Sequence, residues 1–197
     1  MLHLHAHGFV DGAYLRALAK EASHDLVNPL LLVNHAARQV QNWGVPSGYA
    51  GMLALTRVTY YDAQAEDESK IDPCLQDYWR QVELLPDTHL GFGTVRGAAN
   101  RKTPRQKGVD TLLAVDMLVG AFTKIFNAAI LVAGDADFVP VVQEVRRRGV
   151  MVALVGTDRA ADDLRRAADR FVRIGTGPGM APADFPSLIV GDRTWRL

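Results

Sequence analysis

The sequence predicts an α/β protein with a mostly parallel central sheet that is covered by helices on both faces. Apolar stretches of strand length alternate along the chain with stretches of helical spacing. Two of the strands, residues 128–133 and 150–155, are apolar throughout, which is typical of strands buried on both faces. Short links join them to the helical pattern of residues 138–148, as in a parallel βαβ unit.

Length and composition indicate one globular domain and exclude several classes of protein. The 197 residues are enough for one sizeable core. The formal net charge is zero, so binding to nucleic acid would depend on a local basic patch. The single cysteine, Cys74, excludes an internal disulfide and a cysteine-based metal cluster, and it fits a reducing compartment. No apolar run approaches the ~20 residues that span a bilayer and no signal pattern opens the chain, so we expect a cytoplasmic protein without a membrane partner.

The N-terminal segment predicts the first strand, which ends at Phe9-Val10 and is followed by Asp11-Gly12. His3, His5 and His7 alternate with apolar residues and therefore share one face of this strand. Three histidines on one face could bind a transition metal, or they could face solvent at an edge of the sheet near the terminus. We expect the solvent-facing edge.

Residues 14–40 have helical spacing, and Asn28-Pro29 is expected to break them into two helices. Leu30, Leu31 and Leu32 make the start of the second helix apolar on every side. This stretch is either part of the core or a contact between two copies of the chain in a homodimer.

Three further elements are expected in the middle of the chain. Residues 56–61 are rich in β-branched and aromatic side chains and predict a strand, residues 73–84 predict a helix, and residues 88–95 predict a third strand. Trp79 could stack on a nucleic-acid base, but its helical spacing with apolar neighbours favours a place in the core.

Residues 96–108 are predicted to form a loop with the densest positive charge in the chain. The segment holds five basic residues and no acidic one: Arg96, Arg101, Lys102, Arg105 and Lys107. It could contact phosphates of a nucleic acid, or it could be a solvated loop without a ligand, and the segment alone does not favour either.

Two carboxylates follow the buried strand at residues 128–133. Asp135 and Asp137 come directly after Gly134, where the strand gives way to a helix. Like charges this close repel each other, and a divalent cation between them would relieve the repulsion. One Asp could simply cap the helix, but a cap needs only one. Asp11 has the same setting after the first strand, which makes capping alone a less satisfactory explanation.

A further acidic residue, Asp110, begins the helix predicted at residues 110–122. Asp110 is its first-turn residue, where a carboxylate also favours the helix dipole. Asp116 lies about 120° around the same helix, so one face does not present both carboxylates, and we rank Asp116 below Asp110.

The carboxyl ends of parallel strands share one edge of a sheet, which is where α/β proteins bind ligands. Asp11 and Asp135 should therefore meet at this edge, with Asp137 just beyond it, and Asp110 joins them if its helix begins there. Oxygen-only ligands favour Mg²⁺ or Mn²⁺ over Zn²⁺. Such an ion activates water and neutralises charge on a phosphodiester.

These residues resemble the NYN domain, the LabA-like branch of the PIN-like nuclease group. Four blocks and a weaker fifth carry the resemblance, in order along residues 9–174. The blocks are Phe9-Val10-Asp11-Gly12, Tyr60-Tyr61-Asp62, Lys107-Gly108-Val109-Asp110 running on to Ala114-Val115-Asp116, Leu131-Val132-Ala133-Gly134-Asp135-Ala136-Asp137-Phe138-Val139-Pro140, and Leu164 with Ala168-Asp169-Arg170-Phe171.

The resemblance implies a PIN-like three-layer α/β/α sandwich over residues 1–175 and a metal-dependent endoribonuclease. Residues 176–197 would be an irregular C-terminal extension, with a strand or hairpin as one option. The acidic positions of the family map onto Asp11, Asp110, Asp135 and Asp137, with Asp116 at a recurrent acidic position. Mg²⁺ or Mn²⁺ would be the cofactor, and single-stranded RNA the partner. Contacts to the RNA are expected from Arg101, Lys102, Arg105 and Lys107.

One residue departs from the family pattern. The family often has Asn three residues after the first Asp, and Tyr14 stands there in this chain. A phenol cannot act as both amide donor and carbonyl acceptor. Tyr14 and the neutral net charge favour the alternative of an inactive RNA-binding or regulatory module with the same fold. A phosphatase with a nucleophilic Asp is a more remote alternative.

Overall fold

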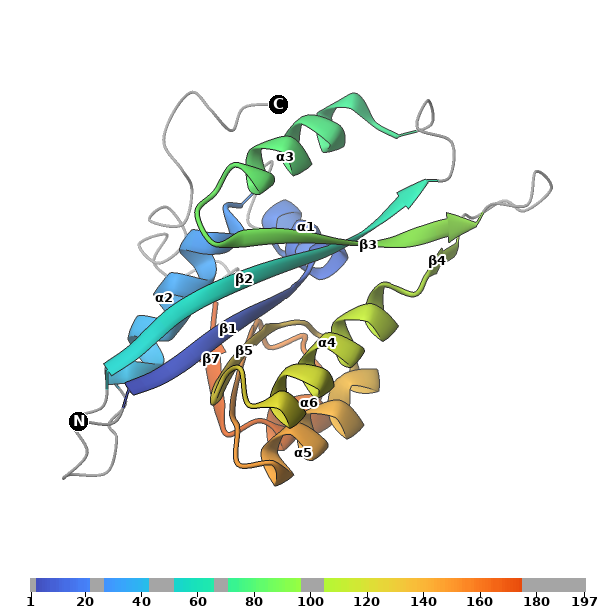
Figure 1. Cartoon of the computed structure of the whole chain (residues 1–197). Helices are drawn as coiled ribbons and strands as arrows, with labels where there is room; N and C mark the ends of the chain where they lie inside the picture. The colour runs from blue at the N-terminus through green and yellow to red at the C-terminus, as the bar shows by residue number, and fades with distance from the viewer. Residues whose placement is uncertain (1–2, 22–26, 43–51, 66–70, 97–104, 175–197) are drawn as a thin grey trace.

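The structure is a computed structural model that describes residues 3–21, 27–42, 52–65, 71–96 and 105–174. Seven strands form one sheet in the order β4-β3-β2-β1-β5-β6-β7 (Figure 1). The strands are β1 (His3–Asp11), β2 (Met52–Ala65), β3 (Thr88–Arg96), β4 (Arg105–Lys107), β5 (Ala128–Val132), β6 (Met151–Gly156) and β7 (Arg170–Arg173). All neighbouring strands are parallel except β3 and β4, which are antiparallel.

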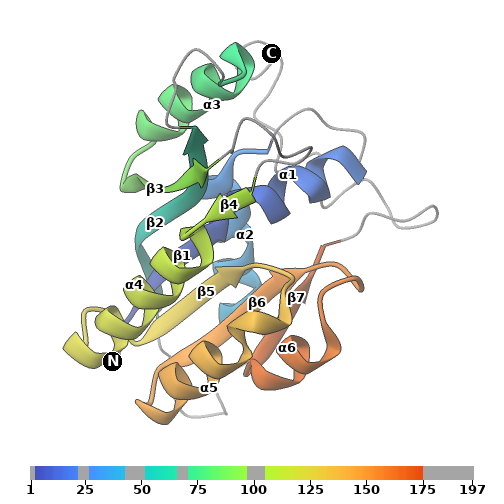
Figure 2. The same ribbon diagram turned by 90° about the vertical axis from the view of Figure 1, so that its right-hand side faces the viewer.

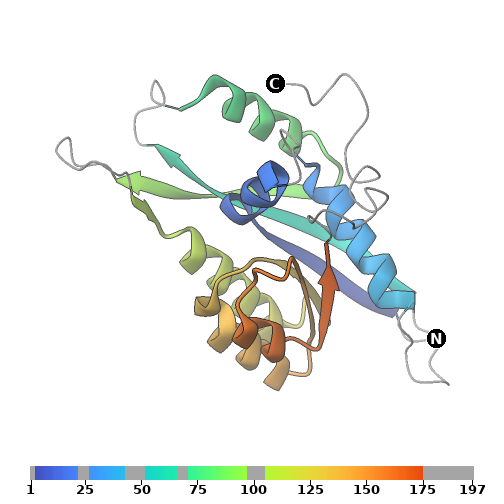
Figure 3. The same ribbon diagram turned by 180° about the vertical axis from the view of Figure 1, so that it is seen from behind.

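Helices cover both faces of the sheet and complete three layers, as the sequence predicts. One face packs against α1 (Gly12–Glu21), α2 (Pro29–Asn42) and α3 (Pro73–Glu83). The other face packs against α4 (Val109–Thr123), α5 (Val139–Arg147) and α6 (Asp162–Ala167), with a 3₁₀ turn, η2 (Ala136–Phe138), before α5. Figure 2 shows α4 beside α5 along one side of the molecule, and Figure 3 shows α1 and α2 over the opposite face.

The burial of β5 explains why its sequence predicts a buried strand so clearly. Ile130 and Val132 enter the core under α1–α3, whereas Leu131 and Ala133 enter the core under α4–α6. Because both faces are covered by helices, alternate residues need no polar side chain and the strand is apolar throughout.

The break between the first two helices is also where the sequence places it. Asn28 accepts a hydrogen bond from the backbone N–H of Leu31 at 3.1 Å, and Pro29 is the first residue of α2. Proline suits this position because the first helical N–H has no partner within the helix. Leu32 is fully buried and Leu30 packs against the same core, so at least these two members of the leucine stretch serve the fold.

The histidine-bearing strand is not at an edge of the sheet, so that part of the expectation is wrong, although His5 near the terminus is exposed. β1 lies between β2 and β5 in the centre of the sheet. His7 is only 9% exposed and its ring centroid lies 5.0 Å from that of Phe126. Burial, followed by the nearby charge of Arg57, lowers the pKa of His7 to about 4. His7 is therefore a neutral core residue, because strand order depends on distant parts of the chain that local alternation does not reveal.

The basic segment also differs from the prediction of a loop. Residues 105–107 form the short edge strand β4, paired with β3 through Thr94 opposite Lys107 and Arg96 opposite Arg105. A very short edge strand with basic residues discourages pairing with other chains. The predicted tail at 176–197 and the basic residues Arg101 and Lys102 lie outside the described residues. In the part of the chain that the structure describes, no helix is long and apolar enough to cross a membrane.

Candidate active site

The carboxyl ends of β1 and β5 lie side by side and place the predicted acidic residues at one edge of the sheet. Val10 is opposite Val132 in the register of these two strands, and each strand ends within a residue of that pair. Asp11 is the last residue of β1, and Asp135 follows β5 by three residues. The parallel register therefore brings together two carboxylates that are 124 positions apart, at 11 and 135.

Asp11 caps helix α1, yet its charge is poorly accommodated. Its Oδ1 accepts a hydrogen bond from the backbone N–H of Tyr14 at 3.1 Å. Such bonds stabilise a carboxylate and lower its pKa. The pKa of Asp11 is nevertheless raised to about 6, first because the group is buried and then because the negative charge of Asp110 is near. The cap explains where the carboxylate sits, but it does not compensate its charge.

Asp135 also caps the turn that follows it. Its Oδ1 accepts a hydrogen bond from the backbone N–H of Asp137 at 3.0 Å, and η2 begins at the next residue, Ala136. The capping interpretation is thus correct for one oxygen of Asp11 and one of Asp135. Asp135 and Asp137 are both exposed, so their carboxylates are open to an incoming ligand.

Asp110 joins the other carboxylates from helix α4. The helix begins after Gly108, whose left-handed φ of 88° turns the chain from β4 into α4. Burial and then the charges of Asp135 and Asp137 raise the pKa of Asp110. Asp110 is therefore within electrostatic range of all three other predicted ligands, Asp11 included. Within the described residues, no arginine or lysine forms an ion pair with any of the four.

The chemistry of this donor set fits a hard divalent cation. The donors are carboxylate oxygens, and their mutual repulsion disfavours ionisation of the group without a cation. Over the ranges that the structure describes, no three acidic, His or Cys side chains already form a compact metal site. Mg²⁺ does not need one, because it usually keeps several water ligands and binds through one or two carboxylates.

A cleft of about 520 Å³ opens beside this acidic edge. Its lining comprises Asp11, Tyr14, Gly134, Asp135, Ala136, Arg159 and Ala161. Tyr14 lies over the ends of β5 and β6: a Cβ at Gly134 would be 2.3 Å from the tyrosine ring, and a Cβ at Gly156 would be 2.6 Å from its hydroxyl. The hydroxyl accepts a hydrogen bond from the backbone N–H of Thr157 at 3.3 Å. Two glycines thus make room for the tyrosine that replaces the usual asparagine.

Comparison with known proteins decides the family. The sequence profile described as "NYN domain" matches residues 8–175. The chain belongs to the NYN domain family. No curated protein matches the chain. Among solved structures, the chain resembles the crystal structure of a protein of unknown function, VPA0982, from Vibrio parahaemolyticus RIMD 2210633, with a TM-score of 0.59, 18% sequence identity, and coverage of 87% of this chain and 93% of that chain. This likeness supports the α/β fold, and the NYN assignment indicates a PIN-like nuclease class.

Other predicted residues of the NYN domain are placed differently. Asp116 accepts a hydrogen bond from the hydroxyl of Tyr61 at 2.8 Å, so this carboxylate is engaged with the face of β2 under α4. The structure does not gather it with Asp110. Of the basic residues, Arg105 and Lys107 belong to β4, which leads directly into α4 and Asp110. Their side chains lie outside the described part, as do Arg101 and Lys102 entirely.

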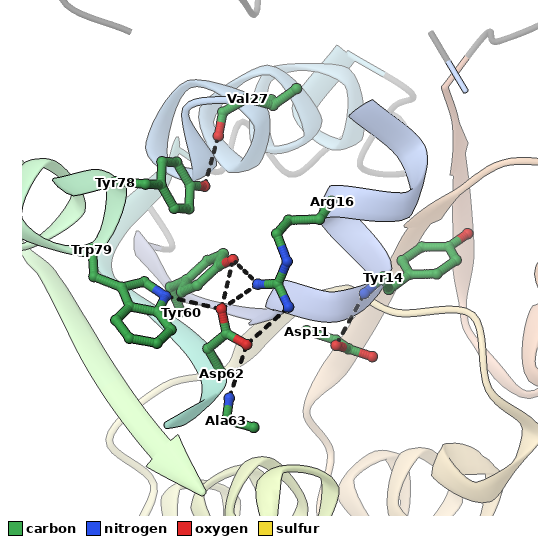
Figure 4. A network of polar contacts seen from close by, with 9 residues as sticks. All are labelled: Asp11, Tyr14, Arg16, Val27, Tyr60, Asp62, Ala63, Tyr78 and Trp79. Carbon is green, nitrogen blue, oxygen red and sulfur yellow. Dashed lines mark hydrogen bonds and ion pairs between the residues drawn. The ribbon is translucent and has the colours of Figure 1, made fainter. Parts of the chain in front are cut away.

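A buried polar network lies next to the site and was not predicted, although its central residue, Asp62, belongs to the block Tyr60-Tyr61-Asp62. Asp62 on β2 is 1% exposed and forms an ion pair with Arg16 of α1 (Figure 4). The same carboxylate accepts hydrogen bonds from Trp79 Nε1 at 2.9 Å, Tyr60 Oη at 3.2 Å and the backbone N–H of Ala63 at 2.8 Å. The available signal was a single acidic residue among the β-branched and aromatic residues of a central strand, because a buried charge needs partners.

This network holds the start of α1 against β2. A Cβ at Gly12 would lie 2.5 Å from the Tyr60 hydroxyl, so Gly12 permits the close approach. Arg16, one turn further along α1, is joined to Asp62 and to the Tyr60 hydroxyl, the latter at 2.9 Å. Because Asp11 directly precedes Gly12, the contacts that fix α1 also fix the position of the first acidic residue.

Proposed function

We propose that this NYN domain is a metal-dependent endoribonuclease that hydrolyses phosphodiester bonds of single-stranded RNA. The observation that carries the proposal is that Asp11 and Asp135 line one cleft at the edge of the sheet, where the charge of Asp110 interacts with both of them and with Asp137. The four residues come from three separate parts of the chain, and no arginine or lysine among the described residues forms an ion pair with them. The pKa values of Asp11 and Asp110 are raised. Capping a helix would need only one of these side chains, not several carboxylates close together.

The four carboxylates would hold Mg²⁺ or Mn²⁺ at this edge. The bound ion would supply a Lewis acid for the phosphoryl oxygens and would lower the pKa of a water molecule for attack. The protein fixes two of the ligands in advance, because backbone N–H groups of Tyr14 and Asp137 hold one oxygen each of Asp11 and Asp135. Preorganised ligands need less rearrangement when the charged substrate arrives.

The surroundings of Asp110 favour an anionic substrate. Asp110 lies in the first turn of α4, where free backbone N–H groups and the helix dipole attract phosphate. The chain immediately before this turn contains Arg105 and Lys107. We propose that these residues, with Arg101 and Lys102, contact the phosphates that flank the scissile bond.

Cleavage of a fluorophore-labelled single-stranded RNA tests the proposal. The purified protein should cut the RNA internally when Mn²⁺ or Mg²⁺ is present and should stop when the metal is chelated. Asp135→Asn should lose at least about 100-fold in rate, because one ligand and one negative charge are removed while the cap can persist. Asp77→Asn on the exposed face of α3 is the matched control. Equal cleavage by wild type and Asp135→Asn would refute the proposal.

A second candidate is an RNA-binding module without catalysis. Tyr14 favours it, because the ring occupies the position of the usual asparagine and supplies no amide. Salt-sensitive binding of the same RNA by wild type, with no product formed in Mn²⁺, would identify this candidate.

A further inference from the structure

The cleft beside the acidic edge is lined by two residues that have no part in the proposed metal site. Tyr14 and Arg159 line it together with Asp11 and Asp135. An aromatic ring and a guanidinium next to a carboxylate centre are the pair of groups that recognise an unpaired nucleotide, through its base and its phosphate.

The tyrosine ring is held firmly. It lies over Gly134 and Gly156, where any side chain would overlap it, and its hydroxyl accepts a hydrogen bond from Thr157. Its backbone N–H is joined to Asp11. A ring fixed in this way loses little conformational freedom when a base stacks on it. It is half-buried, packed against the core on one side and lining the cleft on another.

Arg159 brings positive charge to the same cleft. It lies in the loop between β6 and α6, and its backbone N–H donates to Thr157 Oγ1 at 3.3 Å. The loop is tied to β5 by a hydrogen bond from the N–H of Ala161 to the carbonyl of Gly134 at 2.9 Å. Arg159 therefore comes from a loop that is anchored directly beside Asp135. Arginine matches phosphate geometry better than lysine does.

We propose that Tyr14 and Arg159 form a nucleotide subsite, in which an unpaired RNA base stacks on the Tyr14 ring and Arg159 contacts the adjoining phosphate. The inference rests on the proposed function, since it names residues that bind the RNA substrate of the same site. The cleft volume of about 520 Å³ is within the range of small-ligand sites. Stacking requires a base that is not paired, so the subsite selects single-stranded over double-stranded RNA.

The first experiment measures stacking without turnover. A short oligoribonucleotide containing the fluorescent base 2-aminopurine is titrated with the full-length protein in chelator, where hydrolysis does not proceed. Fluorescence should be quenched on binding to wild type and to Tyr14→Phe, which keeps the ring. Tyr14→Leu should weaken binding roughly tenfold and abolish the quenching, because stacking on an aromatic residue contributes about 1–3 kcal/mol per base. Phe122→Leu, an exposed aromatic of α4, is the matched control.

The second experiment separates Arg159 from general charge effects. Arg159→Gln should raise KM several-fold with little change in kcat, and the slope of log affinity against log salt should fall by about 1. Arg147→Gln on α5 removes the same charge outside the cleft and should change neither quantity.

The outcomes distinguish this inference from the proposed function. If wild type cleaves RNA but Tyr14→Leu keeps normal KM and normal quenching, the subsite is wrong and the nuclease remains. If wild type quenches the probe through Tyr14 but forms no product in Mn²⁺, the subsite is supported and the nuclease proposal fails. If double-stranded RNA binds as tightly as single-stranded RNA, the stacking inference is overturned. Folding of each variant is checked by circular dichroism. If Tyr14→Leu does not fold, loss of quenching in Tyr14→Phe, or an unchanged KM and salt slope in Arg159→Gln, overturns the inference.

Discussion

Asp62 on β2 and Arg16 on α1 form an ion pair in which the carboxylate is 1% exposed and the arginine side chain 26% exposed. Three further donors, from Tyr60, Trp79 and the backbone of Ala63, complete the surroundings of the carboxylate. The pair joins the first helix to the second strand within five residues of Asp11. It thus connects the stability of the core to the geometry of the acidic edge.

Breaking this pair should destabilise the protein strongly. Arg16→Met leaves a buried carboxylate without its cation, and the free energy of unfolding should fall by about 3 kcal/mol, as measured by urea denaturation. The exposed pair of Arg80 and Asp77 on α3 provides the control, because Arg80→Met should cost less than about 1 kcal/mol. Equal effects of the two substitutions would show that the buried pair does not hold α1 to β2.

The raised pKa of Asp11 should make the protein less stable as the pH rises. The folded state holds the proton up to a pH of about 6, whereas the unfolded chain releases it near the ordinary value of 3.8. Between these values the folded state binds more protons, so the free energy of unfolding falls with increasing pH, by about 3 kcal/mol for this group.

Asp11→Asn should remove this fall in the free energy of unfolding with pH, because asparagine can still cap α1 but carries no charge. The comparison is urea unfolding of wild type and Asp11→Asn at about pH 4 and about pH 7, without divalent metal. The variant should gain stability relative to wild type at the higher pH. A constant difference between the two proteins at both pH values would contradict the assignment.

Divalent cations should stabilise the folded protein through the same carboxylates. For a dissociation constant of about 1 mM, addition of about 10 mM Mg²⁺ should add about 1.4 kcal/mol to the free energy of unfolding. The increase should be absent or much reduced in Asp110→Asn and retained in Glu144→Gln, whose carboxylate on α5 pairs with Arg147 and Arg148. The measurement is the thermal midpoint with and without metal. A uniform response of all three proteins would mean that the ion binds elsewhere.

The contact between Gly156 and Tyr14 should appear as energetic coupling. Gly156→Ala places a methyl group 2.6 Å from the tyrosine hydroxyl and should lower the free energy of unfolding by about 1–3 kcal/mol. In a Tyr14→Ala background the same substitution should cost far less, because the obstructing ring is gone. A double-mutant cycle should therefore give a coupling energy of about 0.5–3 kcal/mol. Simple additivity would contradict the packing described for Tyr14.

The parts of the fold that follow from short stretches of sequence were predictable. Residues 128–133 are apolar on both faces because helices cover both sides of β5, and Asn28-Pro29 breaks the helices through its own local chemistry. Strand order is not local. The placement of β1 in the centre of the sheet, and with it the burial of His7, depends on pairing with β2 and β5, which no alternation within residues 3–10 encodes.

The same distinction applies to the site. Asp11 and Asp135 were predictable as edge residues, since each directly follows an apolar strand and parallel strands end together. Whether Asp110 lies near Asp11 and Asp135 depends on how α4 packs on the sheet. From the sequence it could therefore be expected there only if its helix begins at that edge. Tyr14 was recognised as a departure from the family, but its fit over Gly134 and Gly156 joins three distant segments and needed the structure. The network around Asp62 was not predictable for the same reason, since the partners of this carboxylate come from α1, β2 and α3.

A crystal structure of the protein soaked with Mn²⁺ is the most direct test of the metal site. We expect an anomalous peak at the carboxyl edge of β1 and β5, with carboxylate oxygens from at least two of Asp11, Asp110, Asp135 and Asp137 at about 2.1 Å, the distance typical of such ions. An ordered edge with no peak in the soaked crystal, or a peak bound by other residues, would contradict the proposed metal site.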